Sequence, residues 1–171
     1  MITIKSTAGS DSTAIAQLWN AKRLDAASCW QQADEVDQQY IEGMRLAGFV
    51  CSIARVDDVP VGFGLWFGSA GEARLVALAA DDAEVYYRLM GAFCDWALAL
   101  GVQAGFAEIG TAPTTEKARM DALGVIGYVP IGFAPLAPGQ NPDERVPVLL
   151  RAECDLAALK DAVTLILEPA P

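Results

Sequence analysis

The chain has 171 residues, of which 53% are hydrophobic and 20% are charged. This is enough apolar sequence for one substantial core and too little charge for extended disorder. The formal net charge is −10 and no run of Lys or Arg offsets it, so we do not expect nucleic acid as a partner. The sequence contains no histidine, which excludes serine–histidine and cysteine–histidine nucleophiles and removes the commonest metal ligand.

The four cysteines also argue against a metal site. Cys29, Cys51, Cys94 and Cys154 are widely spaced, whereas structural zinc sites and thioredoxin-type redox centres use close pairs. We therefore expect no bound metal. Cys51 and Cys94 lie in apolar segments and are predicted to be buried, reduced thiols.

The sequence gives no indication of a membrane or export signal. Its apolar runs are too short and too often interrupted to span a bilayer. The first five residues lack the basic segment and apolar stretch of a signal peptide. We expect a cytoplasmic protein without a membrane partner.

The N-terminal part of the chain is predicted to contain one strand and two helices. Residues 2–7 alternate apolar and polar side chains, which indicates a strand. Ser10 or Asp11 then caps a helix. A second helix is predicted from Asp34 to a stop at Gly48, and the segment between the two helices is predicted to be irregular.

Three strands and a long helix are predicted next. Residues 49–56 and 59–67 are strand-like runs joined by a tight turn at Asp57 and Asp58. A third strand, at about residues 72–79, leads into a helix over 82–100. Nearly all of this helix is apolar, so we expect it to be buried against a sheet.

The remainder of the chain is predicted to close the sheet. Residues 103–109 form a strand, a short helix runs to Leu123, and residues 125–134 and 145–153 form an antiparallel pair. A loop rich in Pro, Gly, Asn and Asp joins the two strands of that pair.

The C-terminal segment is predicted to extend a single domain that spans residues 1–171. The core of this domain covers residues 2–153, and residues 154–171 form an extension. A short helix near residues 155–162 precedes an apolar stretch at 163–167, for which we consider an edge strand or a homodimer contact.

This order of elements resembles the GNAT superfamily of Gcn5-related N-acetyltransferases over residues 2–153. Val-Pro-Val-Gly-Phe-Gly at residues 59–64, Trp-Ala-Leu-Ala-Leu-Gly at 96–101 and Thr-Glu-Lys-Ala at 115–118 are similar to phrases of that family. The resemblance implies an α/β (α+β) fold, with a mixed, mostly antiparallel sheet of about seven strands flanked by four helices. It also implies an acyl-CoA-dependent N-acetyltransferase acting on a small amine.

The resemblance further implies where acetyl-CoA would lie. The fourth and fifth strands of such a sheet splay apart, and the pantetheine arm pairs with the backbone of the fourth. Here those backbone groups belong to Val76, Ala77, Leu78 and Ala79. A backbone N–H near Leu78 would stabilise the developing oxyanion while the amine attacks the thioester directly.

Two side chains are candidates for acid–base chemistry. Glu108, amid apolar residues of the fifth strand, is the candidate general base, since partial burial would raise its pKa. The alternative is an ordinary solvated glutamate. Tyr128 is the candidate acid, with a packed strand tyrosine as the alternative. Trp30 and Trp66 are candidates for lining an acceptor pocket or, alternatively, for core positions.

The turn after Ala79 departs from the family's phosphate-binding pattern. That pattern supplies glycines, whose backbone N–H groups approach the pyrophosphate. Here the turn has no glycine and contains Asp81, Asp82 and Glu84, which would repel a phosphate and which also suit an ordinary helix start. The alternative function is therefore a catalytically inactive ligand-binding or protein-interaction module. In this module Tyr86 or its neighbour Tyr87 would fill the CoA groove.

Overall fold

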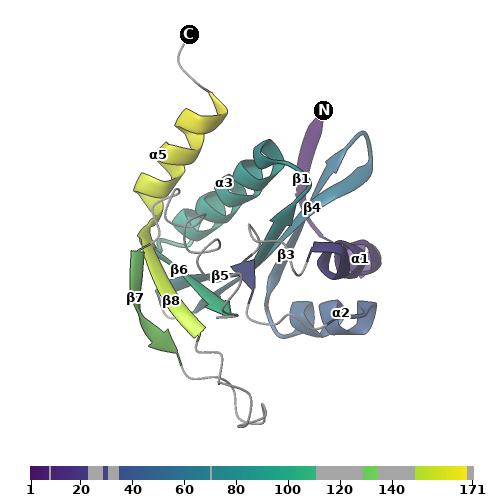
Figure 1. Cartoon of the computed structure of the whole chain (residues 1–171), viewed down its shortest axis with the longest axis horizontal. Coiled ribbons are helices and arrows are strands. Elements are labelled where there is room, and N and C mark those ends of the chain that lie inside the picture. Colours follow the sequence, from purple (N-terminus) through teal and green to yellow (C-terminus); the bar gives the residue numbers. More distant parts are fainter. Residues whose placement is uncertain are drawn as a thin grey trace.

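The structure is a computed structural model in which one mixed sheet carries helices on both faces (Figure 1). It describes residues 1–7, 9–22, 29–30, 35–69, 71–110, 129–134 and 149–168. Within them the strands follow one path in the order β1-β3-β4-β5-β6-β8-β7, and β2 pairs with β5 off this path. All pairings are antiparallel except that between β5 and β6. The seven-strand path agrees with the prediction, and β2 is an eighth strand that was not predicted.

The N-terminal elements begin with the predicted strand. They are β1 (Ile2–Ser6), the 3₁₀ turn η1 (Gly9–Asp11), α1 (Ser12–Lys22), β2 (Cys29–Trp30) and α2 (Gln38–Leu46). The predicted start of the second helix at Asp34 is wrong. The helix is capped at Asp37, whose carboxylate accepts a hydrogen bond from the Tyr40 backbone N–H at 2.8 Å.

The central hairpins form as predicted. β3 (Val50–Val56) and β4 (Val59–Ser69) are joined at Asp57 and Asp58, both of which have positive φ, 48° and 68°. Two consecutive left-handed residues are the signature of a type I′ turn, whose twist matches that of paired strands. β4 continues two residues past the predicted end and then leads into β5 (Glu72–Ala80).

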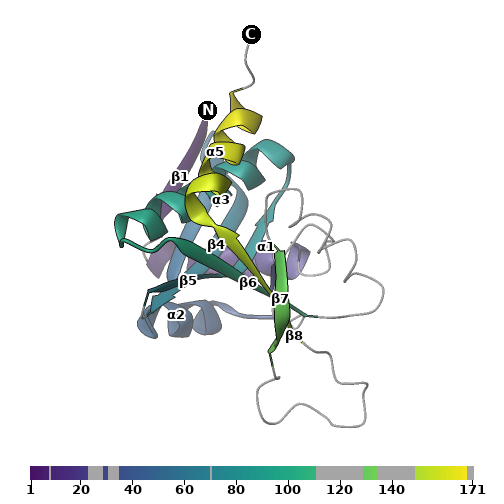
Figure 2. The same ribbon diagram turned by 90° about the vertical axis from the view of Figure 1, so that its left-hand side faces the viewer.

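Two helices cover one face of the sheet. α3 (Ala83–Ala99) buries Leu89 and Phe93, and Gly101 follows it with a φ of 76°. The C-terminal helix α5 (Leu156–Leu167) packs beside α3 and buries Leu159 and Val163 (Figure 2). The predicted edge strand at 163–167 is therefore wrong. The spacing of the two buried side chains, four residues apart, continues the helix.

The closing strands confirm the predicted antiparallel pair. β6 (Ala104–Gly110) pairs with β8 (Leu149–Asp155), which in turn pairs with β7 (Val129–Ala134). The predicted short helix ending at Leu123 and the predicted loop between the last two strands lie outside the described residues.

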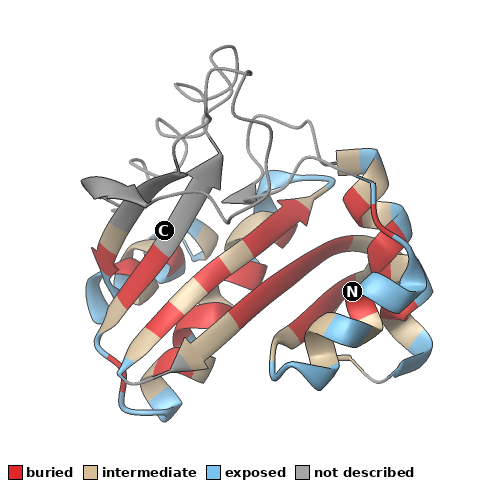
Figure 3. Ribbon diagram, turned by 90° about the horizontal axis from the view of Figure 1, so that it is seen from below, coloured by how far each residue is buried: buried red, intermediate tan, exposed pale blue. Residues whose placement is uncertain are grey.

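The sheet separates two cores. One contains α3, α5 and side chains such as Trp66, Leu75 and Leu78. The other contains α1, α2 and the opposite side chains of β3, β4 and β5 (Figure 3). Cys51, Cys94 and Cys154 are buried and reduced, which confirms the prediction for the first two. None of the helices in the described part of the chain is long and apolar enough to cross a membrane.

Candidate functional site

The two parallel strands β5 and β6 separate halfway along their length. Residues 72–75 pair with residues 104–107, and no pairing between the two strands continues beyond Leu75. From there β6 pairs with β8 alone, over Glu108 to Gly110. The divergence occurs where the family resemblance implies a splayed sheet.

A β-bulge interrupts β5 at the same point. On β4, Leu65 lies opposite Ala77 and Trp66 lies opposite Leu75, so Val76 has no register partner on β4. A bulge bends its strand and withdraws one residue from the regular hydrogen-bond ladder. The bulge and the end of the β5–β6 pairing therefore coincide at Val76.

The next residues of β5 are paired on both edges. Leu78 lies opposite Gly64 of β4 and also opposite Cys29 of β2, and Ala77 lies opposite Trp30. A strand has two hydrogen-bonding edges, and an extended ligand arm requires one of them. β2 takes that edge at Ala77 and Leu78, two of the four residues predicted to bind pantetheine.

The N-terminus of α3 carries its own anion. The Asp82 side chain accepts the backbone N–H of Val85 at 2.9 Å, which is the N-cap contact of the helix. Asp81, the single residue between Ala80 and this cap, donates its backbone N–H to the Val61 carbonyl at 2.8 Å. The connection from β5 to α3 is thus short and tied to β4.

Further charges surround this N-terminus. Asp81 pairs with Lys22 at 3.0 Å, and Glu84 pairs with Arg88, four residues on in α3, at 2.8 Å. These two cations are therefore already matched with carboxylates. A phosphate placed close to a carboxylate here would meet a repulsion of roughly 1 to 4 kcal/mol per pair, depending on the local dielectric.

These residues do not fit acetyl-CoA. A pyrophosphate needs unclaimed backbone N–H groups and a helix end without negative charge. Asp82 instead accepts the Val85 N–H and places a carboxylate at this helix end. The pantetheine arm needs a strand edge at the residues that β2 covers. We therefore derive no catalytic step through acetyl-CoA.

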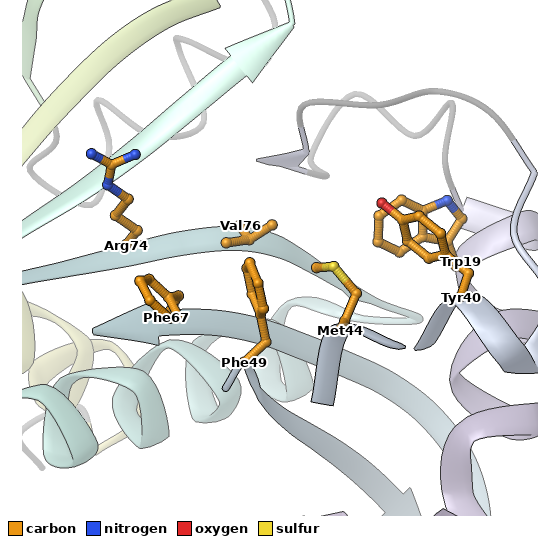
Figure 4. Close-up of a pocket in the computed structure, with 7 residues that line it drawn as sticks. All are labelled: Trp19, Tyr40, Met44, Phe49, Phe67, Arg74 and Val76. Atoms are coloured by element: carbon orange, nitrogen blue, oxygen red, sulfur yellow. The ribbon is translucent and has the colours of Figure 1, made fainter. Parts of the chain in front are cut away.

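A pocket of about 320 Å³ lies against the bulge, on the α1 and α2 side of the sheet (Figure 4). Its described lining combines four aromatic rings with one thioether, one aliphatic side chain and one guanidinium: Trp19, Tyr40, Phe49, Phe67, Met44, Val76 and Arg74. Small-molecule pockets measure roughly 300–1,000 Å³ and are mostly apolar with a few polar groups. The lining of this pocket has that composition, and its volume is at the lower end of the range.

The rings of the pocket are held by mutual packing. Trp19 and Tyr40 meet edge to face with centroids 6.0 Å apart, and Phe49 and Phe67 lie 5.0 Å apart. Trp19 also stacks on Phe63 at 6.0 Å. Such pairs prefer these geometries and add stability beyond the area they bury. Burial raises the pKa of the Tyr40 hydroxyl, so that group is neutral at physiological pH.

Arg74 provides the charge of the pocket. Its Nη2 lies 3.3 Å from a carboxylate oxygen of Glu72, and the two side chains are 41% and 39% exposed. Charge-assisted N–H···O contacts are usually about 2.7–2.9 Å long, so this one is loose. In Figure 4, Arg74 and the Trp19–Tyr40 pair lie at opposite ends of the set, with Val76 between them.

The residues predicted from the sequence are only partly brought together. Val76 lines the pocket, while Ala77, Leu78 and Ala79 are buried in β5. Glu108 lies on β6 opposite Arg151 of β8, and its side chain is outside the described part.

The side chains of two other predicted residues, Tyr128 and Trp30, are not described. Tyr128 lies outside the described residues, and only the backbone of Trp30 is described, in β2. Trp66 is not a pocket residue, which corrects that hypothesis. It is 2% exposed and packs against Phe93 and Trp96 in the core beneath α3.

Sequence reasoning missed most of the pocket because its residues come from different elements. Trp19 and Tyr40 belong to α1 and α2, and Phe67 belongs to β4, so no local spacing joins them. No group of acidic or cysteine side chains that could hold a metal occurs among the described residues.

No protein-family model and no curated protein matches the chain. Among solved structures it is similar to yncA from Salmonella typhimurium, solved with its cofactor acetyl-CoA, at 17% identity and a TM-score of 0.65, over 91% of this chain and 94% of that one. Ard1 from Thermoplasma volcanium matches at 18% identity and 0.66, over 90% and 97%. A GCN5-related N-acetyltransferase from Kribbella flavida matches at 15% and 0.62, over 90% and 97%. At these identities the likeness shows the fold: the chain has the GNAT fold.

Proposed function

We propose that this chain is a ligand-binding protein that has the GNAT fold and does not take acetyl-CoA. The observation that carries the proposal is the Asp82 carboxylate bound to the Val85 N–H at the start of α3. In this fold the start of that helix is where a pyrophosphate would need the same backbone groups. Because a helix N-terminus stabilises one nearby anion, the protein's own carboxylate replaces the ligand's.

Two further features support this reading. β2 pairs with β5 at Ala77 and Leu78, along the edge that a pantetheine arm would use. A pocket of about 320 Å³ nevertheless remains beside Val76, lined by aromatic rings and Arg74. The chain thus keeps a small-molecule cavity at the splay while the features expected to hold the nucleotide are missing. We propose that the ligand enters this pocket.

Thermal unfolding with and without acetyl-CoA tests the proposal. A ligand that binds only the folded chain adds about 2.7 kcal/mol to the free energy of unfolding at one hundred times its Kd. We expect no shift in Tm with acetyl-CoA at millimolar concentration. A rise of several degrees would mean that a CoA site survives, and the proposal would fail.

A second candidate, an acyl-CoA-dependent N-acetyltransferase acting on a small amine, is favoured by the backbone at Val76. A bulge at the point where β5 and β6 part leaves a residue outside the ladder, where its N–H can face a reacting group. If this candidate is right, amines are acetylated in the presence of acetyl-CoA and Glu108→Gln lowers turnover without unfolding the chain. Undiminished turnover would remove Glu108 from that mechanism.

A further inference from the structure

We propose that the pocket beside Val76 binds a small amphipathic carboxylate, with an apolar or aromatic body on the rings and the acid group at Arg74. The inference rests on the proposed function in that it assigns a ligand class to the pocket named there. It draws on the composition of the pocket, the charge at one end of it, and its size.

The body of the ligand is specified by the apolar lining. Trp19 and Tyr40 offer an edge-to-face pair, while Phe49 and Phe67 offer a second pair of rings and Met44 a flexible thioether. Aromatic faces and the flexible methionine thioether pack well against flat or aliphatic groups. A ligand without an apolar face would leave these surfaces unmatched.

The acid group is specified by Arg74. It is the one charged side chain among the described residues that line the pocket, and it is cationic in a chain whose net charge is −10. A guanidinium presents planar donors that match a carboxylate in two-point geometry. Glu72 contacts its Nη2 at 3.3 Å, and the Arg74 side chain is 41% exposed, so a ligand acid would approach the guanidinium beside this partner.

The same charge argues against an amine ligand. An ammonium group in the pocket would face Arg74, and no carboxylate occurs among the described lining residues to stabilise it. The acidic surface of the whole chain would attract cations to the molecule but not into this cavity. A volume near 320 Å³ is at the lower end for small-molecule sites and suits a compact ligand.

Calorimetric titration with three matched probes tests the inference. Phenylbutyrate, phenylbutyramide and phenylbutylamine share one apolar body and differ in charge. We expect phenylbutyrate to bind most tightly and phenylbutylamine most weakly. Binding of the amine equal to or tighter than that of the acid, or no binding of phenylbutyrate at millimolar concentration, would overturn the inference.

Two arginine variants supply the matched control. Arg74→Gln should weaken phenylbutyrate binding by about tenfold, equal to ~1.4 kcal/mol, and leave phenylbutyramide unchanged. Arg88→Gln removes an arginine of similar exposure that also pairs with a glutamate but lies outside the pocket, and should leave all three affinities unchanged. Equal losses in both variants would reduce the effect to overall charge and overturn the inference.

Two further measurements test where phenylbutyrate binds and whether the ligand class holds independently of the proposed exclusion of CoA. Phenylbutyrate should shift the NMR signal of the Trp19 indole N–H, and an unmoved Trp19 signal in the presence of binding would contradict the assigned pocket. Titration with acetyl-CoA is a separate arm. If acetyl-CoA binds while the acid preference persists, the proposed function fails and the ligand class stands. If neither binds, the ligand class fails and the exclusion of CoA stands.

Discussion

Gly62 of β4 shows how closely the strand approaches the start of α3. A Cβ at this position would lie 2.9 Å from the Ala79 carbonyl oxygen and 2.9 Å from Cγ1 of Val85. The first of these atoms is backbone and cannot rotate away. Gly62→Ala should therefore lower the free energy of unfolding by about 1–3 kcal/mol, measured by urea denaturation.

Gly43 is the matched control for that substitution. It lies within α2, and a Cβ there would meet nothing within 4 Å. Gly43→Ala should raise the free energy of unfolding by up to about 1 kcal/mol, because alanine has the higher helix propensity. If both variants destabilise the chain equally, the close approach at Gly62 is not the cause.

The buried thiols predict a pH effect. Burial raises the pKa of the Cys51 thiol to about 11 and that of Cys94 to about 12, from an ordinary value of 9.0. The unfolded chain ionises first, so the stability that these groups contribute is complete below pH 9.0 and is lost as pH rises from there toward 11 and 12. Urea midpoints should therefore fall above pH 9.0. A midpoint that stays constant through this range would contradict the burial of these thiols.

Alkylation of individual cysteines checks the same environment. Below pH 9.0 both folded thiols should be protonated and covered, so iodoacetamide should modify Cys51 and Cys94 only after denaturation. Peptide mass spectrometry separates these two positions from the other cysteines. Labelling of either residue in the native chain at the denatured rate would show that it is accessible.

Two substitutions of Asp82 distinguish its role as the N-cap of α3 from the effect of its negative charge. Asp82→Ala should cost roughly 0.5–2 kcal/mol of unfolding free energy, because the Val85 N–H loses its acceptor. Asp82→Asn keeps an acceptor oxygen and should cost much less. Urea unfolding of both variants makes the comparison, and equal losses would mean that charge rather than capping stabilises this helix end.

The sequence predicted most elements, for reasons that differ between them. Long periodic segments such as α3 and the hairpin turn at Asp57 and Asp58 carry their own local signal. β2 has two residues, too few to show a period. The apolar stretch at the end of α5 reads equally as strand or helix until α3 is present beside it.

The candidate site was less predictable than the fold. The family resemblance singled out four residues of β5, of which Val76 lines the pocket while Ala77, Leu78 and Ala79 are buried. The bulge at Val76 depends on how β4 and β5 are paired, which no single segment encodes. The pocket forms only where α1, α2 and β4 converge. Nothing in the sequence therefore indicates that residues such as Trp19 and Phe67 line the same cavity.

At the scale of the whole molecule, the chain has the GNAT fold, and its own groups occupy the strand edge and the helix start where we propose that CoA binding is lost. The sheet order, the parallel β5–β6 pair and the helices on both faces match the GNAT arrangement. The strand edge is covered by β2 and the helix start is capped by Asp82.

The most direct test is calorimetric titration of the purified chain with acetyl-CoA at physiological salt. The account predicts no binding up to millimolar concentration, because both the strand edge and the helix N-terminus are already occupied. Binding near micromolar concentration would contradict it, since the ligand would then have to displace β2 and tolerate the carboxylates at the start of α3.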